Sequence, residues 1–367
     1  MEQQPSFATS MLKYRGASPF ILKSQRMLNK EEVLNKSIEL NFETAQEFLT
    51  FFSPYLNKKF DFRNYIFRGH GNVNHQLIPS VLRRDSVTIK RIQAMSARIS
   101  ITETDLFFES KQIQAEIAIL RQFYKISNRN GLFTPPTERW FKDDIHLVTN
   151  QFAVADRHED EEWLPKELLE LAALAQHYGI PTRLMDWSHD PLTACFFACT
   201  SDVESSQDLC VWAMNANKIT LLKKSGKVDK VNFFTPNYKN NDNVTAQKGL
   251  FTYCSSTLKR NIFPREVFTL PHTQRDEILG QKERVDTRPL NEIVLDELIE
   301  SSNTNLGEEP LFIKVTLPNF HRMELYRMLI LLGYDFPRIY PGYHGIANHL
   351  DFLKNIKDDV SRQEFLL

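Results

Sequence analysis

Apolar residues recur at intervals of three and four along several stretches of this chain, a spacing that predicts amphipathic helices. The stretches with this spacing are Asn41–Phe52, Phe107–Ser127, Trp163–Tyr178 and Met323–Leu332. Gly179 directly follows the third stretch, where a glycine commonly ends a helix. A further helix is expected to begin with Asp190 as N-cap and Pro191 as first residue. Because Leu192–Cys199 is apolar on nearly all sides, this helix should be buried.

Short apolar runs bounded by turn residues predict strands. The runs are Tyr65–His70, Leu209–Met214, Gly249–Tyr253 and Phe312–Leu317. A polar loop, Asn237–Asn243, precedes the third run, and Gly333, Pro337 and Pro341 are expected to end the ordered pattern. Helices and strands follow one another without regular alternation, which favours an α+β fold over a parallel sheet.

Composition narrows the class of protein. A chain of 367 residues accommodates two domains or one elaborated domain. Its 45 Lys and Arg against 46 Asp and Glu exclude a globally basic nucleic-acid binder. Only 12 residues are glycine, about half of what the average usage of ~7% would give. This scarcity disfavours a doubly wound fold with a glycine-rich phosphate loop.

Targeting and metal-binding patterns are absent from the sequence. The four cysteines, Cys195, Cys199, Cys210 and Cys254, form no CxxC pair and are expected to pack as small hydrophobic residues without binding a metal. The first 14 residues lack the apolar core of a signal peptide, and no run approaches the ~18 apolar residues of a membrane span. The chain is therefore expected to be cytoplasmic, in a reducing compartment, and not bound to membranes.

Arg68 lies in an apolar strand, between Phe67 and Gly69. A guanidinium in a sheet is costly unless it is paired, and its planar fork suits a phosphate or a carboxylate. Arg68 is therefore either a ligand-binding residue or half of a structural ion pair. Gly69 permits close approach of a ligand or of another backbone segment.

A second polar segment, Gln176–Ser188, connects two apolar stretches and is rich in side chains that form polar contacts. Such groups either brace one another or face a polar ligand. A third segment carries Gln247 just before a predicted strand, where a hydrogen-bonding residue at the sheet edge is the simpler interpretation.

Three motifs resemble the FRG domain, a family named for a Phe/Tyr-Arg-Gly motif. They are Phe67–His70 with Ile78–Arg84, then His177–Ser188 with Pro191 and Ala198 beyond it, and finally Leu332-Gly333, Tyr340–Gly342 and Gly345–Ala347. The resemblance covers roughly residues 41–355. It implies an N-terminal arm at 1–40, one domain at 41–355 with a helical insertion at about 85–165, and a C-terminal tail at 356–367.

A second, weaker resemblance is to the Arg-Ser-Glu class of ADP-ribosyltransferases. Arg68 matches the arginine that binds the phosphate and ribose of the dinucleotide, and Ser188 matches the serine ahead of the helix below the nicotinamide pocket. The third element of that class ends in a catalytic Glu, whereas this chain has Gln247 and no acid there. Asp186 is then the first candidate to supply the missing carboxylate. The resemblance implies an ADP-ribosyltransferase-like core with a mixed or antiparallel sheet.

The same resemblance implies NAD as substrate and no metal. It places Arg68, Ser188, Gln247 and Asp186 in catalysis. The residues expected around the dinucleotide are Phe67, Gly69, His70, His177, Tyr178, Thr182, Arg183 and Trp187. Breaking the nicotinamide–ribose bond passes through an oxocarbenium-like state, which calls for a clamp on the diphosphate and negative charge near the cation.

These features predict a mono-ADP-ribosyltransferase that acts as a toxin or anti-phage defence effector, restrained by a partner antitoxin or inhibitor protein. RNA or single-stranded DNA is narrowly preferred over protein as its target. Basic clusters are available as phosphate contacts or as a solvated surface: Arg83-Arg84, Lys90-Arg91, Lys223-Lys224, Lys227, Lys230 and Lys259-Arg260. One alternative is a non-catalytic sensor or interaction module with a nucleotide-sized pocket. Another is a hydrolase that uses His177 with Asp186.

Overall fold

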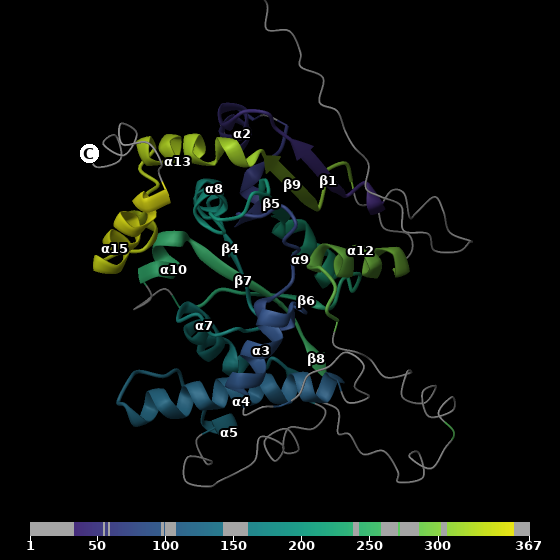
Figure 1. Ribbon diagram of the computed structural model, residues 1–367. Helices are drawn as coiled ribbons and strands as arrows, with labels where there is room; N and C mark the ends of the chain where they lie inside the picture. Colours follow the sequence, from purple (N-terminus) through teal and green to yellow (C-terminus); the bar gives the residue numbers. More distant parts are fainter. Residues whose placement is uncertain are drawn as a thin grey trace, which may run out of the picture.

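The fold is that of a computed structural model, shown as a ribbon in Figure 1. It describes residues 33–53, 56–57, 59–96, 99, 108–141, 161–237, 242–257, 271, 286–301 and 307–355.

Seven strands form the main sheet, in the spatial order β1-β9-β5-β2-β4-β7-β6. Their bounds are β1 Ser37–Asn41, β2 Tyr65–His70, β4 Met185–Ser188, β5 Leu209–Asn215, β6 Val231–Phe234, β7 Gly249–Cys254 and β9 Phe312–Leu317. β1 runs parallel to β9, while the other neighbouring strands are antiparallel, so the sheet is mixed. Two short strands, β3 Glu162–Trp163 and β8 Ser256–Thr257, pair with each other.

Helices surround the sheet. The α-helices are α2 Ala45–Phe52, α3 Ser86–Met95, α4 Phe108–Arg129, α5 Glu138–Phe141, α7 Leu169–His177, α8 Pro191–Thr200, α9 Ala216–Lys224, α10 Asp242–Gln247, α12 Leu290–Glu300, α13 Arg322–Leu331, α14 Phe336–Ile339 and α15 Tyr343–Phe352. Short 3-10 helices lie at Phe62–Asn64, Ser80–Leu82, Lys166–Leu168, Asn319–His321 and Leu353–Asn355.

Three hydrophobic clusters hold these layers together. One cluster packs α2, α8 and α13 against β2, β5 and β9. A second packs α9 and α12 against the sheet, and a third joins α3, α4, α5 and α7 to β7. Figure 1 shows α2 and α13 above the sheet, α12 beside it and the long α4 below it. The candidate insertion at 85–165 contributes α3, α4 and α5, all in the lower part of this view.

The structure confirms the α+β class and most of the elements expected from periodicity. The four predicted strands correspond to β2, β5, β7 and β9. Asp190 caps α8 by accepting a hydrogen bond from the Leu192 amide, and Gly179 has a φ of 78° after α7. Cys195, Cys199 and Cys210 are buried free thiols, while Cys254 is half-buried.

Several expectations about element bounds were wrong. Residues 37–40, assigned to the arm, belong to β1, because hydrogen bonding to β9 makes this short segment an edge strand. The helix expected from Trp163 begins only at Leu169, since Trp163 is held in β3. Order does not end at Gly333: Pro337 lies in the first turn of α14, where proline is tolerated, and α15 follows.

Candidate functional site

The candidate site begins where β2 and β4 separate. These two strands share a single residue pair in register, Phe67 with Ser188. Beyond that pair, the Nη1 of Arg68 donates to the backbone oxygen of Asp186 at 2.7 Å and lies 3.5 Å from its carboxylate Oδ2. The guanidinium therefore fills the gap between the strands. Its side chain is 16% exposed, and its Nη2 has no hydrogen-bond partner among the described residues.

His70 fixes the direction of the Arg68 side chain. Its Nε2 accepts a hydrogen bond from the Nε of Arg68 at 2.8 Å, and its Nδ1 lies 3.0 Å from the carbonyl oxygen of His75. This arrangement is satisfied by a neutral ring that is protonated on Nδ1. Burial, together with the charge of Arg68, holds the pKa of His70 well below 6.5. His70 thus orients the arginine and stays uncharged.

The depressed pKa of His70 makes stability depend on pH. In the unfolded chain the ring has an ordinary pKa of about 6.5, so on acidification the unfolded state takes up the proton first. The free energy of unfolding is therefore expected to fall as the pH is lowered from about 7 to about 5. His177 and His189, whose pKa values are lowered by burial, contribute to the same trend.

The check is urea denaturation of the wild type and His70→Gln across this pH range. Glutamine can still accept from Arg68 but does not titrate, so its stability should decline less with acid. Equal declines in the two proteins would contradict the assignment.

Asp186 presents a carboxylate to the same place. Its side chain is 61% exposed, and its Oδ1 accepts a hydrogen bond from the Nε2 of Gln176 at 2.7 Å. Tyr340 lies nearby from the end of α14; burial, with the charge of Asp186, raises the pKa of that phenol to about 12. Of the predicted catalytic residues, Arg68 and Asp186 are the pair whose side chains meet directly.

Ser188 lies within the sheet and has both its hydrogen-bonding roles filled. Its hydroxyl donates to the backbone oxygen of Gln247 at 2.7 Å and accepts from the Asp190 amide at 2.9 Å. The side chain is buried, with the residue 4% exposed. In this arrangement Ser188 ties β4 to the start of β7 and to the N-cap of α8.

Gln247 likewise points to another element. Its Nε2 donates to the carbonyl oxygen of Ile339, the last residue of α14, at 3.2 Å. Gln247 is the last residue of α10 rather than a strand residue, and Lys248 follows it with a φ of 48°. The three predicted segments nonetheless come together, because β2, β4 and β7 are neighbours in the sheet.

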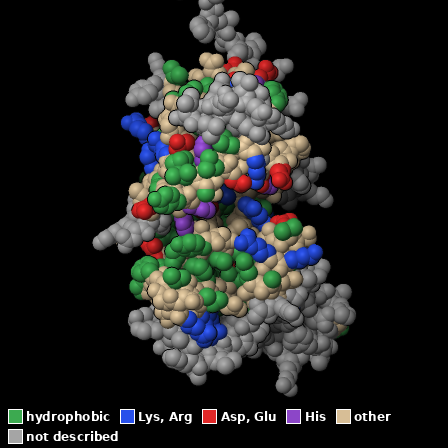
Figure 2. Space-filling view, turned by 60° about the vertical axis from the view of Figure 1, so that its left-hand side comes forward, with side chains coloured by type: hydrophobic (Ala, Val, Ile, Leu, Met, Phe, Trp, Pro, Cys, Tyr) green, Lys and Arg blue, Asp and Glu red, His purple; other side chains and the backbone are tan. Residues whose placement is uncertain are grey.

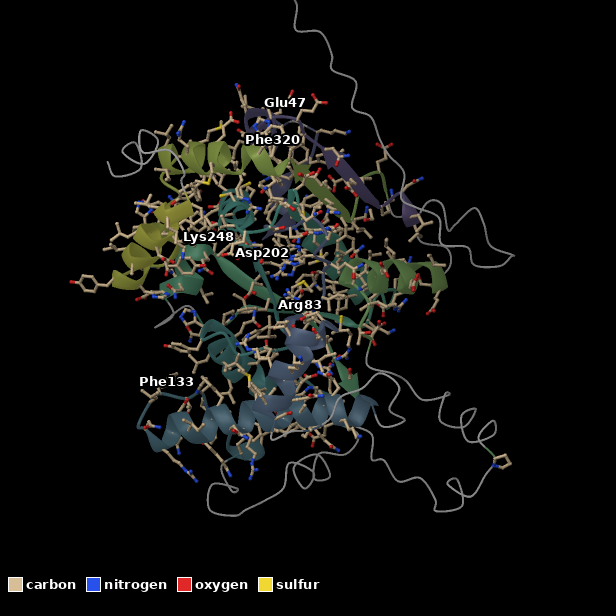
Figure 3. All side chains as sticks on the ribbon, in the orientation of Figure 1. Glu47, Arg83, Phe133, Asp202, Lys248 and Phe320 are labelled. Atoms are coloured by element: carbon tan, nitrogen blue, oxygen red, sulfur yellow. The ribbon has the colours of Figure 1, made fainter. Side chains whose placement is uncertain are left out.

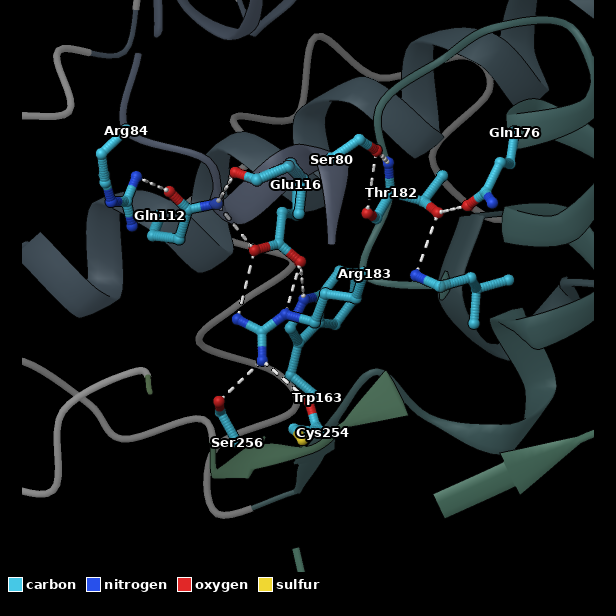
Figure 4. Close-up of polar contacts among 12 residues, drawn as sticks. Ser80, Arg84, Gln112, Glu116, Trp163, Gln176, Thr182, Arg183, Cys254 and Ser256 are labelled. Atoms are coloured by element: carbon cyan, nitrogen blue, oxygen red, sulfur yellow. Dashed lines mark hydrogen bonds and ion pairs between the residues drawn. The ribbon is translucent and has the colours of Figure 1, made fainter. Parts of the chain in front are cut away.

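Arg183 belongs to a buried network of polar contacts, shown in Figure 4. Its Nε and Nη2 contact the two carboxylate oxygens of Glu116 at 2.7 and 3.1 Å, and its Nη1 donates to Ser256. The Nε1 of Trp163 also donates to Glu116. Both charged side chains are almost inaccessible, at 1% and 4%. Arg183 was expected at the dinucleotide; it is instead a structural ion-pair residue, because Glu116 of α4 satisfies its charge.

Three other predicted ligand contacts lie in the core. Phe67 is 1% exposed among the phenylalanines beneath β2. A Cβ on Gly69 would come within 1.9 Å of the Ala194 carbonyl oxygen, so this glycine admits the backbone of α8 rather than a ligand. Trp187 is 3% exposed, and its Nε1 donates to Thr252 at 2.8 Å. Its ring therefore packs in the core and does not stack on a ligand.

The remaining predicted residues lie on or below the rim. Thr182 is buried and bonded to Gln176, whereas Tyr178 is 69% exposed with its ring against that of His177. The Nε2 of His177 is 2.9 Å from the Nδ2 of Asn243, and it forms no hydrogen bond with Asp186. Burial and then the charge of His344 lower the pKa of His177. The His177–Asp186 dyad expected for a hydrolase is thus not formed.

Positive charge collects around Arg68. Figure 2 shows a groove across one face of the molecule, with histidine, lysine and arginine side chains along it. Figure 3 shows Arg83 at the middle of the molecule, just ahead of α3. Arg83 is half-buried and forms no ion pair among the described residues; after burial, its charge helps to lower the pKa of Arg68. The sequence analysis placed Arg83 in a basic cluster. It did not identify Arg83, Gln176 or Tyr340 as neighbours of the site.

The described residues contain no group of three or more His, Cys, Asp or Glu side chains that could hold a metal ion. Within the same part of the chain, no helix is long and apolar enough to cross a membrane. The Lys259-Arg260 cluster lies outside the described residues.

Comparison with known proteins gives one match. No curated protein and no solved structure matches the chain significantly. The family match begins two residues before β2 and ends two residues before β5, so it includes Arg68, the Gln176–Ser188 segment and α8. Residues 63–207 match the family model of the FRG domain, so the part of the chain that carries the candidate site is similar to that family.

Proposed function

We propose that the site formed by Arg68 and Asp186 binds NAD⁺ and that the protein transfers ADP-ribose from it to a macromolecule. The observation that carries the proposal is the convergence of three segments on neighbouring strands. An enzyme that holds one dinucleotide with an arginine, a serine segment and a third segment must bring them together, and β2, β4 and β7 are adjacent.

Arg68 suits the diphosphate. Its Nε and Nη1 are held by His70 and the Asp186 backbone, which leaves Nη2 available to a ligand. Because the side chain is already fixed, it loses little conformational entropy when a ligand binds. Arg83 adds a second guanidinium without a carboxylate partner among the described residues. Two cations near one carboxylate leave a net positive charge for an anion to neutralise.

Asp186 suits the reacting sugar. When the bond between the nicotinamide nitrogen and ribose C1′ breaks, its electron pair leaves with nicotinamide and C1′ becomes cationic. A carboxylate fixed beside that carbon stabilises the cation in the transition state. A nucleophilic atom of the target then bonds to C1′ and loses its proton to Asp186 or water. In this proposal Asp186 supplies the negative charge that stabilises the cation. Gln247 does not supply it, because its side chain is a neutral amide that donates to the Ile339 carbonyl oxygen.

The target that we propose is RNA or single-stranded DNA, in preference to protein. Arg83, whose charge acts on Arg68, and the exposed Lys90 of α3 offer contacts to a phosphate backbone. Transfer of ADP-ribose to nucleic acid would block its use as a template, so we propose that the protein is a toxin or anti-phage effector restrained by a partner protein.

The test is incubation of the purified protein with NAD⁺ labelled in the ADP-ribose part, in the presence of cellular RNA, single-stranded DNA and protein. Arg68→Ala is expected to weaken NAD⁺ binding about 10- to 100-fold, because it removes a charged hydrogen-bond donor. Arg63→Ala is the matched control, since Arg63 is an exposed arginine whose one ion-pair partner in the described part of the chain is Asp61.

Label that survives protease but not nuclease would support a nucleic-acid target, and the reverse would make protein the target. If the wild type neither binds NAD⁺ nor releases nicotinamide, or if Arg68→Ala behaves like Arg63→Ala, the proposed site is wrong.

A second candidate is a nucleotide-binding sensor without catalysis. The observation that favours it is the engagement of Ser188 and Gln247, both of which are hydrogen-bonded to the protein's own backbone. Under this alternative the protein binds NAD⁺ through Arg68 but releases no nicotinamide and labels no macromolecule.

A further inference from the structure

We infer that Gln176 and Thr182 are positioning residues that hold the Asp186 carboxylate with its Oδ2 turned toward Arg68. The inference rests on the proposed function only in giving Asp186 a part in the reaction. The contacts themselves are independent of that assignment and form one continuous hydrogen-bond relay from the backbone to the carboxylate.

The relay begins at a peptide group. The backbone amide of Leu184 donates to the Oγ1 of Thr182 at 3.1 Å. The Thr182 hydroxyl donates in turn to the Oε1 of Gln176 (Figure 4), and the Nε2 of Gln176 donates to the Oδ1 of Asp186 at 2.7 Å. Every step runs in the same direction, toward the carboxylate.

The direction cannot reverse, because a peptide N–H only donates. With one lone pair of its oxygen occupied by Leu184, Thr182 directs its single proton at Gln176. The Gln176 amide must then present Oε1 to Thr182 and its NH₂ group to Asp186. Asp186 Oδ1 is therefore always met by a donor, and a proton on that oxygen would clash with the NH₂ group.

The base of the relay is rigid. Thr182 is 4% exposed, and its backbone amide donates to the Oγ of Ser80 at 3.1 Å. Ser80 returns a hydrogen bond to the Thr182 carbonyl oxygen at 3.3 Å. Gln176 lies in the last turn of α7, so the relay fixes an otherwise exposed carboxylate against the buried Thr182, which the half-buried Ser80 holds in turn.

Because Gln176 holds the Oδ1 of Asp186, the direction of Oδ2 is fixed as well. Oδ2 lies 3.5 Å from the Nη1 of Arg68 and has no other hydrogen bond among the described residues. The charge of Asp186 also acts to raise the pKa of two other titratable groups, although burial is the larger influence on both: His177 of α7 and Tyr340, which directly follows α14. Oδ2 is thus the oxygen available to a sugar hydroxyl or to a developing positive charge.

The test compares three variants in steady-state transfer or nicotinamide release. Thr182→Val removes the hydroxyl with little change in shape, and Thr182→Ser restores it. Gln176→Leu removes both amide contacts. We expect Thr182→Val and Gln176→Leu to lower kcat about 10- to 100-fold with KM for NAD⁺ changed less than about 3-fold, and Thr182→Ser to retain wild-type rates.

The effect must act through Asp186, so the same variants are combined with Asp186→Asn. In that background Thr182→Val is expected to cause no further loss. An equal loss of kcat in both backgrounds, or full activity of Thr182→Val and Gln176→Leu, would overturn the inference. If Thr182→Val does not fold, Gln176→Leu carries the comparison.

A nitrogen NMR measurement keeps this test separate from the proposed function. The side-chain NH₂ signals of Gln176 are assigned by their loss in Gln176→Leu. They should move in Asp186→Ala and Thr182→Val and stay in place in Thr182→Ser. If the wild type does not consume NAD⁺ but these shifts occur, the relay stands and the proposed function fails. Signals unchanged in Asp186→Ala would overturn the relay.

Discussion

Arg183→Met is expected to lower the free energy of unfolding by about 3–5 kcal/mol, because it leaves the buried carboxylate of Glu116 without its charged partner. Of its donors among the described residues, Glu116 then keeps Trp163 and Gln112, at 4% side-chain exposure. The ion pair also joins α4 to the segment that leads into β4. Its loss should therefore loosen the helical lower part of the molecule and the site together.

Equilibrium urea denaturation measures this effect, with the double variant Arg183→Met/Glu116→Leu as its complement. Replacing both charges by apolar side chains removes the desolvation cost as well as the attraction, so the double variant should recover most of the stability. Arg63→Met, which breaks the exposed pair with Asp61, should leave the denaturation midpoint unchanged. A wild-type midpoint in Arg183→Met would refute the structural role of the pair.

Asp186→Asn is expected to reduce the rate of ADP-ribose transfer by about 100- to 1,000-fold with little change in NAD⁺ affinity. The substitution keeps the size of the side chain and its contact with Gln176 but removes the charge that the proposed mechanism places beside the developing cation. Because Arg68 remains in place, binding of the diphosphate should persist. The large effect is therefore confined to kcat.

The measurement is single-turnover transfer at saturating NAD⁺. Asp351→Asn serves as the control, since Asp351 is an exposed carboxylate on α15 that pairs with Lys354. Undiminished transfer by Asp186→Asn would show that another acid carries the reaction, and loss of NAD⁺ binding would show that Asp186 shapes the site rather than the transition state.

Local patterns predicted the elements whose signals lie within one stretch of sequence. The strands β2, β5, β7 and β9 and the cap of α8 follow from apolar runs and from Asp190-Pro191. α15 was missed although Tyr343, Ile346 and Leu350 recur at helical spacing, because the preceding glycine and prolines suggested an end to order. β1 was missed because its strand character depends on pairing with β9, far along the chain.

The sequence predicted those site residues that could be recognised from their own local motif. Arg68 and Asp186 were singled out and do meet. Arg183 and Trp187 were taken for ligand contacts because their partners, Glu116 and Thr252, lie 67 and 65 residues away. No local spacing encodes such pairs, so the side chains that brace the motif could not be separated from those that face the groove.

The limits of the family match differ from the limits of the sheet. Residues 63–207 contain β2 and β4, which share one residue pair, but not β5, with which β2 shares six. Cut out alone, this segment would expose an open strand on each side, a template for aggregation. The segment that matches the family model therefore lacks neighbouring strands that complete the sheet in this structure. To graft Arg68 and Asp186 into another protein would require β5, β7 and β9 as well.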